Sequence, residues 1–216
     1  MKWENIYTID EVGMSEKEAI KAEHYVKGKT KMLEWGSGGT TLYFPQMIDK
    51  YVSIEHDKKW YDIIKSKIHK NVEFYHVPTE TTTYSEDDSF IIELETKAFD
   101  ILEGNKNWYE NHGVKEISKT DDKIYWTTRG GIDWHMGIDY IKKPLDLEHR
   151  DYDVVLVDGR CRAMCAYTTQ YLLKDDGYLL FHDFNHREYY HGILKYYEIV
   201  DTEESLAILQ KIKKQG

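Results

Sequence analysis

The sequence predicts a single α/β domain built around a mostly parallel β-sheet. Short apolar runs of strand length alternate along the chain with longer segments of helical period, a pattern typical of β–α–β units. A glycine-rich turn at 36–39 follows the first of these runs, and a short polar separator divides the last two, as in an antiparallel hairpin. Because such sheets bind ligands at the carboxyl ends of their strands, we expect the functional site at that edge.

The composition is that of a folded protein without export or membrane signals. Hydrophobic residues make up 41% of the 216 residues, charged residues 31% and aromatic residues 14%, which supports a core and argues against disorder. No apolar run approaches the roughly 18 residues of a membrane span, and the first residues contain no signal-peptide pattern. We therefore expect one cytoplasmic domain over 1–216. The net charge of -10 argues against a nucleic-acid partner.

Three helices and three strands are expected to alternate in the first 78 residues. The helices are predicted over 15–27, 40–49 and 57–68, and the strands over 31–34, 51–55 and 72–77. Ser15 and Glu18 form the S-x-x-E pattern of a capping box, and Gly28 is a natural C-terminal stop. Pro45 should lie near the first turn of its helix or kink it. The third helix carries its apolar residues on one side: Trp60, Ile63, Ile64 and Ile68.

Residues 79–150 have little regular periodicity. A stretch of this length inside a compact domain is more often a functional insertion or lid than a linker. Its aromatic residues are expected either to form a small core or to present flat faces to a sugar, and they include Trp108, Tyr109, Trp126 and Trp134. Arg129 and the two glycines after it are expected to form a hinge or to contact an anionic group.

The alternation of strands and helices resumes after residue 150. Strands are predicted over 152–157, 178–181, 197–200 and 206–212, helices over 162–174 and 187–196, and a turn at 175–177. The run at 152–157 is almost wholly apolar, as for a strand that is buried on both faces. The last two strands form the antiparallel hairpin.

The glycine-rich turn and an acid after the next strand are the strongest functional signals. Glycines allow a sharp turn and close approach of the backbone to a ligand. Glu55 follows the second strand, where a carboxylate can accept hydrogen bonds from ribose hydroxyls, although an acid before a helix is also a good N-cap. Glu34 precedes the turn, and Thr40 stands where a dinucleotide motif would have its third glycine, which favours a ligand with a cationic amino-acid group over a pyrophosphate.

In these residues the sequence resembles the class I S-adenosylmethionine (SAM)-dependent methyltransferases, over residues 30–78 and 151–212. Their first motif matches 34–40, their acidic second motif matches Glu55, and the terminal hairpin resembles their antiparallel seventh strand. The resemblance implies SAM as cofactor and a Rossmann-like, seven-stranded, mostly parallel sheet with an insertion after the third strand. The cofactor site implied for this chain consists of Glu34, Gly36, Ser37, Gly38, Thr40, Thr41, Glu55, His56 and Val77.

Two acidic motifs follow the fourth and fifth strands, at the same edge of the sheet. Methyl transfer to a hydroxyl needs a general base or a divalent cation that lowers the hydroxyl pKa. Asp158 and Asp183 resemble the metal-binding acids of catechol-type and some sugar O-methyltransferases, which implies a possible Mg²⁺ or Mn²⁺ site. Phe184 stands where a third ligand is usual, so His182, Asn185 or a residue of the insertion would have to replace it.

The segments L-V-D-G-R and F-H-D-F-N-H-R-E are similar to those of the plant glucuronoxylan (glucuronic acid 4-O) methyltransferase group and of small viral glycan methyltransferases, over 153–200. This likeness implies a catalytic set of Asp158, His182 and Asp183, with Arg160 facing the acceptor. It also implies a carbohydrate acceptor, methylated on a sugar hydroxyl of a glycan or glycoconjugate.

Three alternative functions remain open at this point. The chain would be a metal-dependent phenol or catechol O-methyltransferase if small aromatic acceptors were methylated. It would be an NAD-binding oxidoreductase if it bound NAD and not SAM, although Glu34 and the missing third glycine disfavour this. It would be a non-catalytic binding domain if loss of Asp158 left its biological effect intact.

Overall fold

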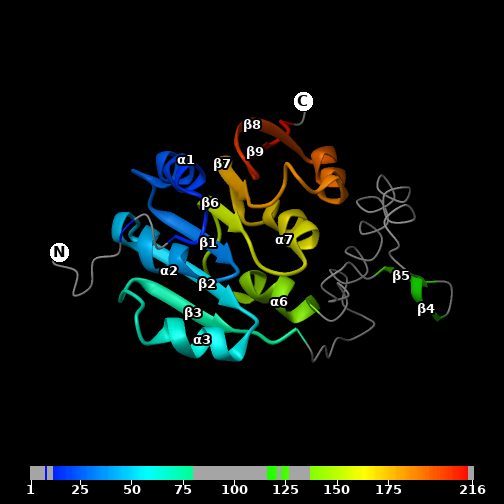
Figure 1. Ribbon diagram of the computed structural model, residues 1–216, viewed down its shortest axis with the longest axis horizontal. Helices are drawn as coiled ribbons and strands as arrows, with labels where there is room; N and C mark the ends of the chain where they lie inside the picture. Colours follow the sequence, from blue (N-terminus) through cyan, green and yellow to red (C-terminus); the bar gives the residue numbers. More distant parts are fainter. Residues whose placement is uncertain (1–7, 9–11, 80–115, 121–122, 127–136, 214–216) are drawn as a thin grey trace.

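The computed structural model describes residue 8 and residues 12–79, 116–120, 123–126 and 137–213 (Figure 1). Its centre is a seven-stranded sheet in the order β3-β2-β1-β6-β7-β9-β8, in which only β9 runs against the other strands. The strands are β1 (Lys31–Trp35), β2 (Lys50–Glu55), β3 (Val72–His76), β6 (Tyr152–Val157), β7 (Leu173–Phe181), β8 (Tyr197–Glu203) and β9 (Leu206–Lys211). This confirms the predicted mostly parallel sheet with its antiparallel C-terminal hairpin.

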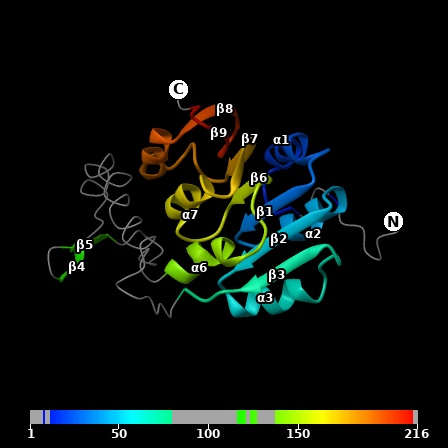
Figure 2. The same cartoon turned by 180° about the vertical axis from the view of Figure 1, so that it is seen from behind.

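Helices cover both faces of the sheet, and each face has its own apolar cluster. The helices are α1 (Glu16–Val26), α2 (Gly39–Tyr43), α3 (Lys58–Lys65), α6 (Ile138–Lys142) and α7 (Arg162–Thr169), and the 3-10 segments are η2 (Phe44–Met47), η4 (Lys143–Asp146) and η5 (Glu188–Lys195). Successive strand residues point to opposite faces. Met32 and Val154 therefore pack with α1 and η2, whereas Leu33 and Val155 pack with α6, α7 and η5. Figure 1 and Figure 2 show α1 and α7 on opposite sides of the sheet.

Several boundaries differ from the sequence-based prediction. The helix expected over 40–49 ends at Tyr43 and continues as η2, because Pro45 lacks the N–H that an α-helical bond needs. The turn expected at 175–177 lies instead within β7, where the register with β6 shifts between the Tyr152 and Val154 pairs, so the extra residues form a bulge. Ion pairs from Asp153 and Lys211 to residues of this bulge hold it against its neighbours. The helix expected over 187–196 is the 3-10 segment η5.

The stretch predicted as an insertion contributes to the core at its C-terminal end. Tyr140 and Ile141 of α6 are fully buried, and the indole Nε1 of Trp35 donates a hydrogen bond to the carbonyl oxygen of Tyr140 at 3.0 Å. Strands β4 (Glu116–Thr120) and β5 (Lys123–Trp126) form a separate antiparallel pair. Trp108, Tyr109, Arg129 and Trp134, and the side chain of Trp126, lie outside the described residues. Among the helices that the structure describes, none has the length and apolarity needed to cross a membrane.

Candidate active site

A cavity of about 530 Å³ opens at the carboxyl ends of β1, β2 and β6, the edge at which the sequence predicts the site. Its size suits a nucleoside-sized ligand. The residues that line it are Gly36, Ser37, Glu55, His56, Asp57, Lys59, Trp60, Ile63, Asp158, Gly159, Arg160 and Arg162. Several predicted site residues of the described part of the chain do not line the cavity: Glu34, Gly38, Thr40, Thr41, Val77, His182 and Asp183.

Gly36 lies in the turn after β1 and packs closely against the turn after β6. Its φ of +89° lies in the left-handed region, and its N–H donates to the carbonyl oxygen of Ile54 at 2.9 Å. A Cβ at this position would lie 2.5 Å from the Cα of Gly159 and 2.8 Å from the carbonyl carbon of Asp158. Only glycine satisfies both the backbone angle and this close approach. The glycine at 36 therefore fixes the distance between the two halves of the cavity wall.

Glu34 lies beneath the glycine-rich turn and does not face the cavity. Its carboxylate is completely buried and accepts hydrogen bonds from the hydroxyls of Thr40, Thr41 (2.6 Å) and Ser53 (2.7 Å). The Thr41 hydroxyl in turn accepts the N–H of Gly38 at 2.9 Å. Burial raises the pKa of Glu34 to about 7, although the three hydroxyl donors oppose the shift. Glu34, Thr40 and Thr41 thus hold the turn in shape from inside.

Replacing Glu34 with glutamine is expected to remove a pH dependence of stability. With a folded-state pKa of about 7 against the usual 4.5, wild type binds an extra proton when folded, so its free energy of unfolding falls as pH rises from 4.5 through 7. The loss amounts to about 3 kcal/mol, since one pKa unit corresponds to roughly 1.4 kcal/mol. Urea denaturation of both proteins at several pH values measures it. Parallel stability profiles for the two proteins would contradict this role of Glu34.

Glu55 ends β2 and is nearly buried at the cavity wall. Its Oε2 accepts the N–H and hydroxyl of Ser37 at 2.9 and 2.7 Å, and its Oε1 accepts the N–H of Asp57 at 2.7 Å. The Nδ1 of His56 lies 2.9 Å from Oε1. Burial alone would raise the pKa of Glu55, but the bonds from His56, Asp57 and Ser37 hold it below its usual value. The carboxylate is therefore charged and accepts several hydrogen bonds from the protein. Among these donors, the Ser37 hydroxyl is the one that rotates most easily.

Two apolar side chains of α3, the helix after β2, line the cavity: Trp60 and Ile63. Trp60 and Ile63 are 43% and 47% exposed, and only Ile64 is buried within α3, so the expected apolar face does not pack as a unit. The Trp60 Nε1 donates to the carbonyl oxygen of Ser37 at 2.5 Å, which fixes the indole beside the glycine-rich turn. Val77 donates its N–H to the carbonyl oxygen of Glu55 at 2.8 Å.

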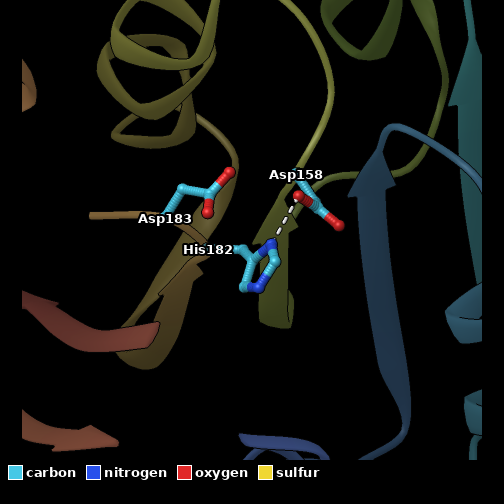
Figure 3. A group of neighbouring side chains, drawn as sticks. All are labelled: Asp158, His182 and Asp183. Atoms are coloured by element: carbon cyan, nitrogen blue, oxygen red, sulfur yellow. Dashed lines mark hydrogen bonds and ion pairs between the residues drawn. The ribbon is translucent and has the colours of Figure 1, made fainter. Parts of the chain in front are cut away.

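Asp158, His182 and Asp183 lie close together where β6 and β7 end (Figure 3). The Nδ1 of His182 is 2.8 Å from Oδ1 of Asp158, and its Nε2 is 3.5 Å from Oε2 of Glu18 on α1. Burial opposes protonation of His182, but Asp158, Asp183 and Glu18 together raise its pKa above the usual value. Both ring nitrogens face carboxylates of the protein, and His182 does not line the cavity.

Arg162, at the start of α7, is the residue of this cluster that the sequence reasoning missed. Its guanidinium lies 2.8 Å from Oδ2 of Asp183 and 3.1 Å from Oδ1 of Asp158. It also donates to the carbonyl oxygens of Asp158, Gly159 and His182 at 3.0, 2.9 and 2.7 Å. The sequence carries no local signal for these contacts, because α7 begins at Arg162 and Asp158 lies before the helix. Within the described residues, Oδ2 of Asp158 has no protein partner, and Figure 3 shows it turned away from His182 and Asp183.

A comparison with solved structures supports the fold described above. A methyltransferase-like protein from Silicibacter pomeroyi matches 92% of this chain and 87% of its own, at 20% identity and a TM-score of 0.55. A precorrin 8w decarboxylase from Methanobacterium thermoautotrophicum matches 96% of each chain (11% identity, TM-score 0.49), and a TehB-like SAM-dependent methyltransferase from Corynebacterium glutamicum matches 91% of this chain and 88% of its own (10%, 0.48). No protein-family model and no curated protein matches the sequence. The strand order and the first of these structures together give the chain a Rossmann-like methyltransferase fold.

Proposed function

We propose that this chain is a SAM-dependent methyltransferase that methylates a hydroxyl group, most specifically a sugar hydroxyl of a glycan or glycoconjugate. The observation that carries the proposal is one cavity that is lined by the turn at Gly36, the acid Glu55 and Asp158. The methyltransferase fold supports the same activity. Because one fold hosts many functions, the reaction is inferred from the residues of the site.

The residues of the cavity fit a nucleoside cofactor. Glu55 is charged at the end of β2, and Ser37 can turn its hydroxyl from Glu55 toward a ligand hydroxyl, which leaves a carboxylate lone pair for the ribose. The half-exposed indole of Trp60 offers a flat face for stacking a purine. SAM, when bound, supplies a methyl group activated by its sulfonium. The protein has to hold the acceptor in line with that methyl and remove its proton.

Asp158 is our candidate for the general base. His182 and Arg162 both contact its Oδ1, so that the second oxygen remains available to a substrate. Oδ2 of Asp158 would accept the proton of the acceptor hydroxyl. Arg160 is an exposed lining residue and can meet a hydroxyl or carboxylate of the acceptor. The acidic net charge favours a carbohydrate over a nucleic-acid acceptor.

Calorimetric titration with SAM and with its demethylated product tests the cofactor assignment. We expect both compounds to bind, and Glu55→Gln to weaken binding at least about tenfold, since the neutral amide accepts hydrogen bonds less strongly. Glu73→Gln is the matched control, because Glu73 lies on β3, pairs with Lys50 at 2.9 Å and does not line the cavity. Binding of NAD in place of SAM would replace this proposal with the oxidoreductase alternative. Once SAM binds, sugar and phenol acceptor panels separate the two kinds of O-methyltransferase.

A further inference from the structure

The three side chains at the ends of β6 and β7 form a group that resembles a metal site. One ligand atom from each of Asp158, His182 and Asp183 lies within 4.8 Å of the others. Carboxylate and imidazole ligands are suitable for Mn²⁺, and a divalent cation here would assist deprotonation of a hydroxyl. Whether these residues fit a metal depends on what already contacts their ligand atoms.

The contacts of Arg162 disagree with a metal at this position. Its guanidinium lies between the two carboxylates, within 3.1 Å of an oxygen of each, and its side chain is only 12% exposed. The three carbonyl oxygens that it also contacts hold the guanidinium plane in place. All its nitrogens therefore have partners, and a rigid fork of this kind matches carboxylates well. Moving Arg162 aside would break five contacts at once.

The charges lead to the same conclusion. The Oδ2 of Asp183 also lies 2.7 Å from the guanidinium of Arg187, and the Oδ1 of Asp158 also faces His182. The two carboxylates are thus paired with two guanidinium groups, and the imidazole of His182 lies between Asp158 and Glu18. A divalent cation would enter a group whose negative charge is already neutralised, within a few ångströms of a buried positive charge, and like charges at that distance repel.

We propose that the guanidinium of Arg162 takes the place of a divalent cation at this edge of the sheet, so that the site works without a metal. Arg162 bridges Asp158 and Asp183 as the cation would, and acts as a positioning residue for Asp158. Its catalytic meaning rests on the function proposed above. Exclusion of a metal by Arg162 does not rest on that function, because metal binding is measured without methyl transfer.

Titration of the protein with Mn²⁺ alone, followed by the electron paramagnetic resonance signal of the free ion, tests the proposal. We expect wild type to show no saturable site up to millimolar Mn²⁺. Arg162→Gln leaves the two acids and His182 in place. It should show a saturable Mn²⁺ site with a Kd at least tenfold below the highest concentration at which wild type shows none. Arg187→Gln is the matched control, because it removes the other guanidinium from Asp183 and leaves Arg162 between the acids; it should gain no such site. Circular dichroism establishes whether each variant is folded. If Arg162→Gln does not fold, Arg162→Met serves as the second variant.

Two results would overturn the proposal. The first is saturable Mn²⁺ binding by wild type that is lost in Asp183→Asn, because Arg162 would then coexist with the metal. The second is equal absence of binding in wild type and both Arg162 variants, because Arg162 would then not be the group that excludes the ion. A failure of SAM to bind would count against the proposed function alone and would leave the Mn²⁺ result as it stands.

Discussion

Gly36→Ala is expected to destabilise the protein by about 3 kcal/mol or more and to abolish ligand binding in the cavity. The left-handed backbone at Gly36 costs a residue with a Cβ roughly 1–3 kcal/mol. The new methyl group would also lie 2.5 Å from the Cα of Gly159, and backbone atoms cannot swing away as the end of a flexible side chain can. Crowding of this kind typically adds about 1–3 kcal/mol. The two turns would have to separate, and the cavity lies between them.

Urea denaturation and calorimetry with SAM measure the two effects of Gly36→Ala. Gly38→Ala is a matched control in the same turn, since the φ of Gly38 is -176° and a Cβ there would have no atom within 4 Å. We expect the free energy of unfolding of Gly38→Ala to change by less than about 1 kcal/mol, because the new methyl group meets no other atom. Equal stability of the two variants would mean that the approach of Gly36 to Gly159 does not constrain the fold.

The secondary structure that the sequence predicted best depends on local chemistry. Ser15 and Glu18 form the expected capping box, with reciprocal bonds of 3.3 and 3.1 Å. The strands were recognisable because each is an apolar run of strand length flanked by polar residues or glycine. The predicted hairpin at the C-terminus is present as β8 and β9, since a separator of that length leaves little alternative to antiparallel pairing.

The details that the sequence could not supply depend on tertiary packing. Glu34 was predicted at the ligand, but spacing along a strand does not reveal that three hydroxyls from α2 and β2 enclose its carboxylate. The pattern in α3 correctly indicated an amphipathic helix, yet a helix of eight residues at the side of the sheet buries only Ile64 and leaves Trp60 to the cavity. Arg162 reaches two acids that follow different strands, β6 and β7, and one of those contacts spans 21 positions in the chain.

Asp158→Asn is expected to lower kcat by about 100- to 10,000-fold while SAM still binds with an affinity close to that of wild type. A positioned general base contributes a factor of this size, and an amide cannot accept the hydroxyl proton. The side chain keeps its shape, so the cavity wall is preserved. Single-turnover methylation of the best acceptor measures the chemical step, and calorimetry with SAM provides the binding control.

Asp183→Asn is the matched variant for Asp158→Asn. Asp183 contacts the same Arg162 guanidinium at 2.8 Å but does not line the cavity, and its amide oxygen would still accept a hydrogen bond. We therefore expect its kcat to fall less than tenfold, because only the positioning of Asp158 is weakened. If Asp183→Asn lost as much activity as Asp158→Asn, or if Asp158→Asn stayed within tenfold of wild type, the base would have to be sought elsewhere. His182 is a poor substitute, because Asp158 and Glu18 already face its two nitrogens, so the free Oδ2 of Asp158 is the acceptor that this cluster offers to a substrate proton.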